Sequence, residues 1–246
     1  MSSKFKIEPS ILREYDIRGV FEDTIHRSDA EHIGRAFGTI VKRRGTSSDR
    51  KVCVGFDGRI SSPELESAII AGLTASGVDA IRVGLGPTPM LYYGVHKLEA
   101  DGGIMVTGSH NPPDNNGFKF MLGKQSFFGH DIKNLGSLIE RTDYLTGEGN
   151  VLDKPMLTSY VDRIASDIVN LKEYKICWDS GNGSAGSAMR MLTKQIPGEH
   201  ILLNDEIDGT FPSHHPDPTI PENLKDLIHT VLTEGCDLGI AFDGDG

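Results

Sequence analysis

The sequence is poor in the features that mark several common protein classes. It has only 3 cysteines in 246 residues, at the distant positions 53, 177 and 236, so neither a disulfide framework nor a zinc cluster is expected. No run reaches the roughly 18 apolar residues that a membrane-spanning helix needs. The N-terminal stretch MSSKFKIEPSILREYD lacks the apolar core of a signal peptide. We therefore expect a cytoplasmic protein with buried free thiols and no membrane partner.

Positive charge is also scarce. The chain has 25 Lys and Arg against 35 Asp and Glu, for a net charge of −10. A nucleic-acid-binding domain needs a basic field, so we expect no nucleic-acid partner. An anionic small molecule is still compatible, because a few local cations and a metal can set the field of one site. The hydrophobic content of 37% is enough for a core, and the length suits one large domain or two of ordinary size.

Apolar runs alternate with amphipathic segments along most of the chain, which is typical of an α/β fold. Residues 11–20 show little pattern, and the quick return after 104–106 predicts an antiparallel strand. The predicted strands are 51–56, 80–83, 104–106, 118–122, 174–178, 200–203 and 238–242, and the predicted helices are 29–44, 61–77, 90–97, 156–170, 188–194 and 221–234.

Two halves of the chain repeat one pattern. VCVGFDG precedes a helix and a strand, as does KICWDSG further along. Residues 142–150 are polar and contain two glycines, so we place a domain boundary there. We expect two similar three-layer α/β/α domains with mixed, mainly parallel sheets, at 1–146 and 147–246.

The loop after the apolar run 104–106 carries a candidate nucleophile. It reads TGSHNPPDNNGFK and presents Ser109 between Gly108 and His110. The two prolines stiffen the loop, and the glycine lets the backbone approach a partner closely. A rigid loop of this kind suits a nucleophilic serine. A merely solvated serine in an Asn-Pro turn is the alternative.

The last residues, DGDG, follow another predicted strand. Asp243 and Asp245 are separated by one glycine, and in a tight loop both carboxylates can converge on one hard cation. Magnesium accepts one or two carboxylates together with phosphate oxygens. A solvated acidic turn is the alternative.

The segment GNGSAG at 181–186 fits the glycine pattern of a dinucleotide site, and Asp205 follows Gly186 by 19 residues (205 − 186). The acidic Asp179 just before it would repel a pyrophosphate. We therefore favour a packing role for these glycines over dinucleotide binding.

Several of these segments together resemble the α-D-phosphohexomutases, the phosphomannomutase/phosphoglucomutase family. TGSHNPPDNNGFK is similar to the family's phosphoserine loop, YDIRG near the N-terminus to its N-terminal signature, and DGDG to the start of its metal loop. The resemblance covers essentially the whole chain. It implies that Ser109 carries the phosphoryl group and that Arg18 and Lys119 lie near it. His110 adjoins Ser109 in the chain, so we expect it to donate a hydrogen bond to the serine or its phosphoryl group, with a structural histidine as the alternative.

The same resemblance implies a metal and a reaction. Ser109, Asp243 and Asp245 would hold Mg²⁺, with a hexose 1,6-bisphosphate as intermediate or activator. The reaction would be the isomerisation of a phosphosugar, between hexose 6-phosphate and hexose 1-phosphate. Mannose or glucose preference and the oligomeric state are left open.

The resemblance extends to the first two of the family's four domains. The metal loop normally continues with another aspartate and an arginine, so we expect a fragment or truncated product that is inactive alone. Two other functions remain as alternatives. One is a non-catalytic α/β fragment that binds only metal or phosphate, and the other is a dinucleotide-dependent oxidoreductase.

Overall fold

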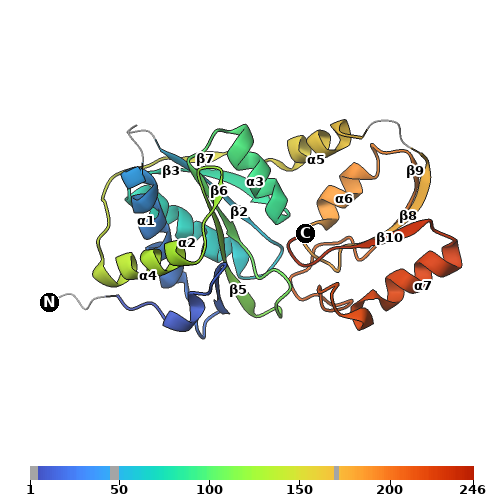
Figure 1. Cartoon of the computed structure of the whole chain (residues 1–246), viewed down its shortest axis with the longest axis horizontal. Coiled ribbons are helices and arrows are strands. Elements are labelled where there is room, and N and C mark those ends of the chain that lie inside the picture. Colours follow the sequence, from blue (N-terminus) through green and yellow to red (C-terminus); the bar gives the residue numbers. More distant parts are fainter. Residues whose placement is uncertain (1–4, 45–49, 169–171) are drawn as a thin grey trace.

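The computed structural model describes residues 5–44, 50–168 and 172–246. Two α/β units lie side by side, each with its own sheet, and the C-terminus lies where they meet (Figure 1). The strand order is β1-β5-β4-β2-β3-β7 in the larger sheet, with β6 paired to β5, and β10-β8-β9 in the smaller one. The expected α/β fold with mixed, mainly parallel sheets is confirmed.

The larger sheet contains the antiparallel return predicted from the sequence. Strand β5 runs antiparallel to both β4 and β1, whereas β2 is parallel to β3 and β4, and β3 to β7. Its strands are β1 (Ile17–Val20), β2 (Lys51–Phe56), β3 (Asp79–Leu85), β4 (Gly102–Val106), β5 (Asn115–Leu122), β6 (Gln125–Ser126) and β7 (Val151–Asp153).

Both faces of the larger sheet are covered, because its central strand is apolar on both sides. In β4, Ile104 and Val106 belong to one core cluster and Met105 to the other, as the alternation of side chains along a strand requires. One cluster is covered by α1 (Arg27–Arg44), α2 (Ser62–Ala75) and α4 (His130–Arg141), and the other by α3 (Thr88–Lys97).

The smaller unit repeats the strand-helix-strand pattern of the larger one. Strand β8 (Tyr174–Asp179) is parallel to β9 (Gly198–Leu203) and to β10 (Leu238–Ala241). Helices α5 (Leu157–Ser166) and α6 (Gly186–Leu192) lie on one side of this sheet and α7 (Lys225–Glu234) on the other (Figure 1). Two short 3₁₀ helices, η1 (Pro9–Ile11) and η2 (Pro221–Leu224), complete the described elements.

Some boundaries differ from the predictions. The predicted helix 156–170 ends at Ser166, and its predicted end at Asn170 lies outside the described residues. The predicted helix 221–234 begins as η2 before it becomes α7. The division between domains at 146/147 stays a prediction, and strand β7, which follows it, pairs with β3 of the larger sheet.

The elements that were not predicted are the short η1, β6 and β7, and two longer ones, β1 and α4. Strand β1 lies in the segment where little pattern was found, and it forms because the backbone of β5 pairs with it. Helix α4 buries a stripe that includes Ile132, Leu135 and Ile139. The residue before it, Gly129, offers no side-chain cap, so the usual start signal of a helix is missing.

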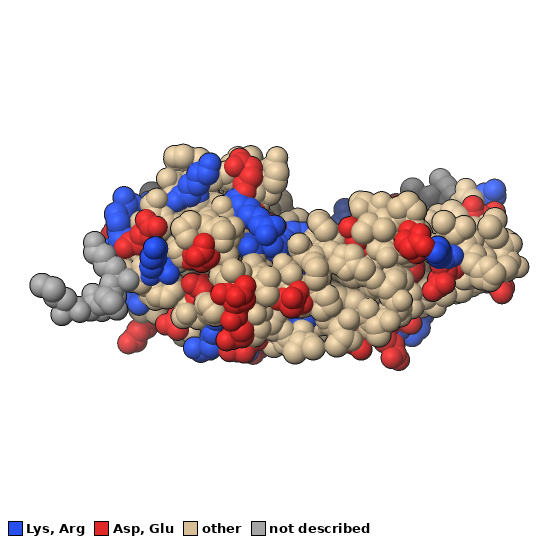
Figure 2. Space-filling model, turned by 90° about the horizontal axis from the view of Figure 1, so that it is seen from below, with Lys and Arg blue, Asp and Glu red and all other residues tan. Residues whose placement is uncertain are grey.

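The positions of the cysteines and of the surface charges fit what the amino-acid composition led us to expect. Cys53 and Cys177 are buried, and Cys236 is half-buried. Burial raises the pKa of Cys53 to about 12. Among the described residues, no helix is long and apolar enough to cross a membrane. On the face shown in Figure 2, acidic and basic side chains are interspersed, with no broad field of one sign.

Candidate active site

The candidate nucleophile lies in the loop between β4 and β5, close to the junction of the two units. Ser109 is 7% exposed, and its backbone has a positive φ of 50°. A non-glycine residue rarely adopts this conformation unless its surroundings enforce it. The Ser109 amide donates to Thr107 Oγ1 at 2.8 Å, and the Asn111 amide to the Gly108 carbonyl at 3.0 Å. The loop is therefore a fixed turn that holds one serine at a defined angle.

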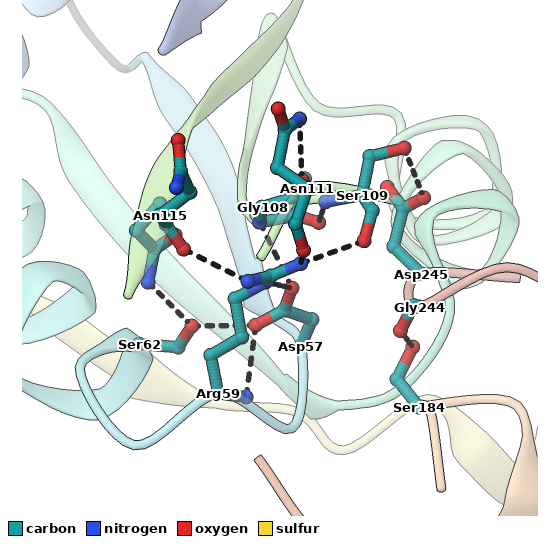
Figure 3. A network of polar contacts seen from close by, with 12 residues as sticks. Asp57, Arg59, Ser62, Gly108, Ser109, Asn111, Asn115, Ser184, Gly244 and Asp245 are labelled. Carbon is teal, nitrogen blue, oxygen red and sulfur yellow. Dashed lines mark hydrogen bonds and ion pairs between the residues drawn. The ribbon is translucent and has the colours of Figure 1, made fainter. Parts of the chain in front are cut away.

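Two carboxylates from the smaller unit converge on this serine. Ser109 Oγ lies 2.9 Å from Asp243 Oδ2 and 3.0 Å from Asp245 Oδ1. The contact with Asp245 is drawn in Figure 3. A hydroxyl has one hydrogen, so it donates to one carboxylate at a time. The fold thus brings Ser109 together with two aspartates that lie more than 130 residues further along the sequence.

Lys119, on strand β5, neutralises part of this charge. Its Nζ lies 2.7 Å from Asp245 Oδ2 and 3.4 Å from Ser109 Oγ. Burial alone would raise the pKa of Asp245, but Lys119 and the hydroxyl donors Thr88 and Ser109 lower that pKa to about 2. Burial and the neighbouring Asp245 instead raise the pKa of Asp243. Asp245 is therefore held as the anion that pairs with Lys119.

The loop that carries Asp243 and Asp245 is held in place by the glycine-rich segment 181–186. Ser184 donates to the Gly244 carbonyl from its amide at 3.1 Å and from its hydroxyl at 3.2 Å (Figure 3). A side chain at Gly183 would come within 3.0 Å of the carbonyl oxygens of Asp243 and Gly244. Gly183 therefore packs against the loop that carries the carboxylates, whereas a side chain at Gly186 would meet the Asp205 carbonyl oxygen at 2.2 Å.

The other two predicted site residues do not contact the Ser109 hydroxyl. Arg18 is buried, pairs with Asp16 and donates to the Thr107 carbonyl at 2.8 Å, so it holds the start of the loop. His110 is exposed, and no hydrogen bond to Ser109 is found for it among the described residues. Their roles near the phosphoryl group stay predictions.

Sequence reasoning missed three residues of this site. Thr88 donates to Asp245 through its hydroxyl, and its amide donates to the Asp245 carbonyl at 2.7 Å. Asp57 and Arg59 contact the serine loop from the end of β2. The DGR triplet after a buried strand was a signal for these two, since charged side chains at a strand end often serve a site. Nothing in the sequence around Thr88 pointed to the site.

The oxygen donors fit a hard cation. An oxygen of each carboxylate lies within 3.0 Å of Ser109 Oγ, and magnesium prefers oxygen ligands of this kind. In the part of the chain that the structure describes, no cluster of three or more His, Cys, Asp or Glu side chains offers a complete metal site. A cation here would need the serine oxygen or a phosphoryl oxygen as a further ligand.

A cavity of about 380 Å³ opens beside Lys119. That volume lies within the range of small-molecule pockets. Its lining combines aromatic side chains with the lysine and one acid, and includes Tyr15, Asp16, Tyr92, Phe120 and Phe128.

Comparisons with known proteins give one consistent result. Residues 9–144 match the family described as phosphoglucomutase/phosphomannomutase, alpha/beta/alpha domain I, and residues 158–246 match domain II of the same family. A phosphomannomutase/phosphoglucomutase of Pseudomonas aeruginosa is 46% identical over 96% of this chain and 50% of its own length. A phosphoglucomutase of Neisseria gonorrhoeae is 39% identical over 97% of this chain and 52% of its own length.

A solved structure agrees with the sequence relatives. A phosphoglucomutase/phosphomannomutase family protein from Burkholderia thailandensis superimposes with a TM-score of 0.91 at 42% identity, covering 96% of this chain and 53% of that one. The chain thus spans about half the length of the curated relatives it matches. With both family domains matched and the serine loop facing the paired aspartates, the chain belongs to the phosphoglucomutase/phosphomannomutase family.

Proposed function

We propose that this chain forms the phosphoryl-transferring part of a phosphohexomutase, with Ser109 as the phosphoryl carrier. The observation that supports the proposal best is the position of Ser109 Oγ, within 3.4 Å of both aspartates and Lys119. The relatives that it resembles are named phosphomannomutases and phosphoglucomutases. Hexose 6-phosphate and hexose 1-phosphate are therefore the proposed substrates.

The proposed reaction proceeds in two phosphoryl transfers. The bond between phosphorus and Ser109 Oγ breaks as a free sugar hydroxyl bonds to the phosphorus, and Ser109 recovers the proton that the hydroxyl gives up. The product is a hexose 1,6-bisphosphate. After this intermediate turns around, Ser109 takes the other phosphoryl group. Transfers of this kind depend mainly on positioning and on neutralising charge.

The residues of this chain would supply both the positioning and the neutralising charge. Lys119 places positive charge beside Ser109 Oγ, at 3.4 Å, where it would stabilise the charge of the phosphoryl oxygens. Arg18 holds the Thr107 carbonyl at the base of the loop. His110, exposed next to Ser109, is the proposed donor to the phosphoryl group.

Asp243, Asp245 and Ser109 are the proposed ligands of Mg²⁺. Their oxygens converge, as described, and they match the donors that this ion prefers. When bound, the ion would supply positive charge to the phosphoryl group. The cavity beside Lys119 is the proposed entrance for the sugar, because its aromatic walls and the lysine suit a phosphorylated hexose.

Phosphoryl transfer to the purified chain tests this function. After incubation with glucose 1,6-bisphosphate and Mg²⁺, intact mass and peptide mapping are expected to show one phosphoryl group, on Ser109. EDTA is expected to prevent this labelling, and added Mg²⁺ to restore it. Ser109→Ala should take no label, while Ser137→Ala, at an exposed serine of helix α4, serves as the matched control. Full labelling of the Ser109→Ala variant would rule the assignment out.

A further inference from the structure

The side chain of Arg59 is buried and fully hydrogen-bonded. Its guanidinium has five N–H donors, and each of them has an acceptor. Nε donates to Asp57 Oδ2 at 3.2 Å. The other four donors go to backbone carbonyls of the serine loop, those of Ser109 and Asn111 at 2.7 Å, Asn115 at 3.0 Å, and Pro112 (Figure 3). One side chain thus fixes both sides of the loop.

Asp57 completes the anchor. Its Oδ2 accepts a hydrogen bond from the Gly108 amide at 3.0 Å, just before the serine. Its Oδ1 accepts from the Arg59 amide at 3.1 Å and from the Ser62 hydroxyl. Asp57 is 1% exposed. The carboxylate is therefore held by helix α2 and its own turn, and it orients the guanidinium that it pairs with.

Arg59 packs tightly against the serine loop. A side chain at Gly108 would lie 2.0 Å from Arg59 Nε and 2.1 Å from its Cζ. On the other side, the Phe211 ring of the smaller unit covers the guanidinium, with 5.1 Å from Cζ to the ring centroid. Because Arg59 is 1% exposed, water does not compete for these charge-assisted hydrogen bonds, and they are strong.

The backbone conformation of Ser109 indicates what the contacts of Arg59 do for the loop. The serine has a positive φ of 50°, which a β-carbon disfavours, so something must hold it there. Arg59 Nη2 binds the carbonyls of Ser109 and Asn111, on both sides of His110. It thereby fixes the peptide planes that determine where Ser109 Oγ points.

We propose that Arg59, anchored by Asp57, is a positioning residue that aims the Ser109 hydroxyl at Asp243, Asp245 and Lys119. This proposal deepens the proposed phosphoryl transfer and names a second, buried arginine on which its geometry depends. Lysine cannot replace Arg59, because an ammonium offers three donors at one point, whereas the guanidinium reaches four carbonyls and a carboxylate at once.

The test uses the 246-residue chain with Arg59→Lys and Arg59→Met, and with Arg43→Lys as the matched control. Arg43 forms an exposed ion pair with Asp143, far from the serine loop in sequence. The first readout is amide hydrogen exchange of Ser109, Asn111 and Asn115, followed by NMR. The second is the initial rate of Ser109 labelling by glucose 1,6-bisphosphate at several concentrations.

Both Arg59 variants are expected to exchange the loop amides about tenfold faster or more, while the amides of strands β2 and β4 remain protected. The maximal labelling rate should fall on the order of 100-fold, as misplacement of a reacting group by about 1 Å can cost. The half-saturating bisphosphate concentration should stay the same. Arg59→Lys should recover only a small part of the rate, and Arg43→Lys should match the unmodified chain.

A second variant keeps the test decisive if the Arg59 variants do not fold. Gly108→Ala leaves Arg59 in the sequence but forces its guanidinium away, so it should loosen the same amides. Unchanged loop exchange in these variants, or an unchanged labelling rate, overturns the positioning role. If the unmodified chain takes no label, the proposed function fails, and loop exchange alone still decides on the role of Arg59.

Discussion

Glu66 is a carboxylate that helix α2 carries into the protein interior. It is 4% exposed, and its Oε1 lies 3.1 Å from Nε of the half-exposed Arg82 on β3. Burial raises the pKa of Glu66, helped by the nearby Asp153 of β7, while Arg82 opposes the rise. A raised pKa in the folded state means that folding favours the protonated form of the Glu66 carboxyl group over its anion. Glu66 therefore costs stability once the pH exceeds the ordinary glutamate value.

As the pH rises, the Glu66→Gln variant should become more stable relative to the native protein. Below pH 4.5, the ordinary pKa of glutamate, the folded and unfolded states are both protonated and the advantage is absent. Above it, the unfolded state ionises first, so the free energy of unfolding of the native protein falls, while the variant avoids this loss. Melting temperatures from pH 4 to 7, with exposed Glu64→Gln as control, test the sign. A melting-temperature difference that shrinks with rising pH contradicts the burial argument.

The site residues differ in how far the sequence could predict them. Ser109, Lys119 and the two aspartates were predicted by their resemblance to family motifs, because residue pattern alone left a solvated serine and a solvated acidic turn open. Their convergence depends on contacts over more than 120 residues, which no local pattern encodes. Arg59 was missed because an arginine after a strand usually faces solvent, and only the fold shows that it is buried.

Helices α1 and α2 cross so closely that glycine is required where they touch. A side chain at Gly72 would lie 2.1 Å from the Glu31 carbonyl oxygen, and one at Gly34 would lie 2.3 Å from the Ile69 carbonyl oxygen. Both obstacles are backbone atoms, which cannot move aside as a flexible side chain can. The two glycines therefore set the distance between the helices that cover one face of the larger sheet.

Gly72→Ala should destabilise the protein, although alanine favours an isolated helix by about 1 kcal/mol. Forcing extra atoms into a packed core typically costs about 1–3 kcal/mol. For a chain of this size, that corresponds to a drop in melting temperature of roughly 2–12 °C. Gly136→Ala in α4 is the control, because its side chain would meet only the end of the Leu12 side chain. Equal melting temperatures for the two variants would refute the close-crossing argument.

Elements with a strong periodic signal were predicted well. Strand β2 was predicted at its observed bounds, 51–56, and α1 within two residues of them. The failures have local causes. Strand β1 includes a buried arginine and a glycine, and it depends on pairing with β5. Helix α4 has a regular apolar stripe, but it begins after a glycine without a cap.

The two units together hold half of what the relatives contain, so we expect the chain alone to be a poor mutase. The P. aeruginosa relative is about twice as long as the matched region, which makes up 50% of it. If the remaining half positions the sugar, its absence removes a contribution of about 7–11 kcal/mol from positioning. A coupled assay of glucose 1-phosphate conversion, primed with bisphosphate, should detect no repeated turnover by the chain alone.

The matched experiment joins this chain to the C-terminal half of the P. aeruginosa relative in place of that protein's own N-terminal half. At 46% identity, the interface between the halves should be largely preserved, so the chimaera is expected to turn over substrate. The same chimaera with Ser109→Ala is the control. Repeated turnover by the chain alone would show that these two units already hold the sugar.

The division of the site between the two units also makes Ser109 a reporter of folding. Its hydroxyl comes from the larger unit and its carboxylates from the smaller one, so the contact forms only after both units have folded and joined. Contacts between residues this distant in sequence form late and slowly. A molecule with two intact but separated units would look folded to circular dichroism and yet accept no phosphoryl group. The labelled fraction of a preparation would then count the correctly assembled molecules.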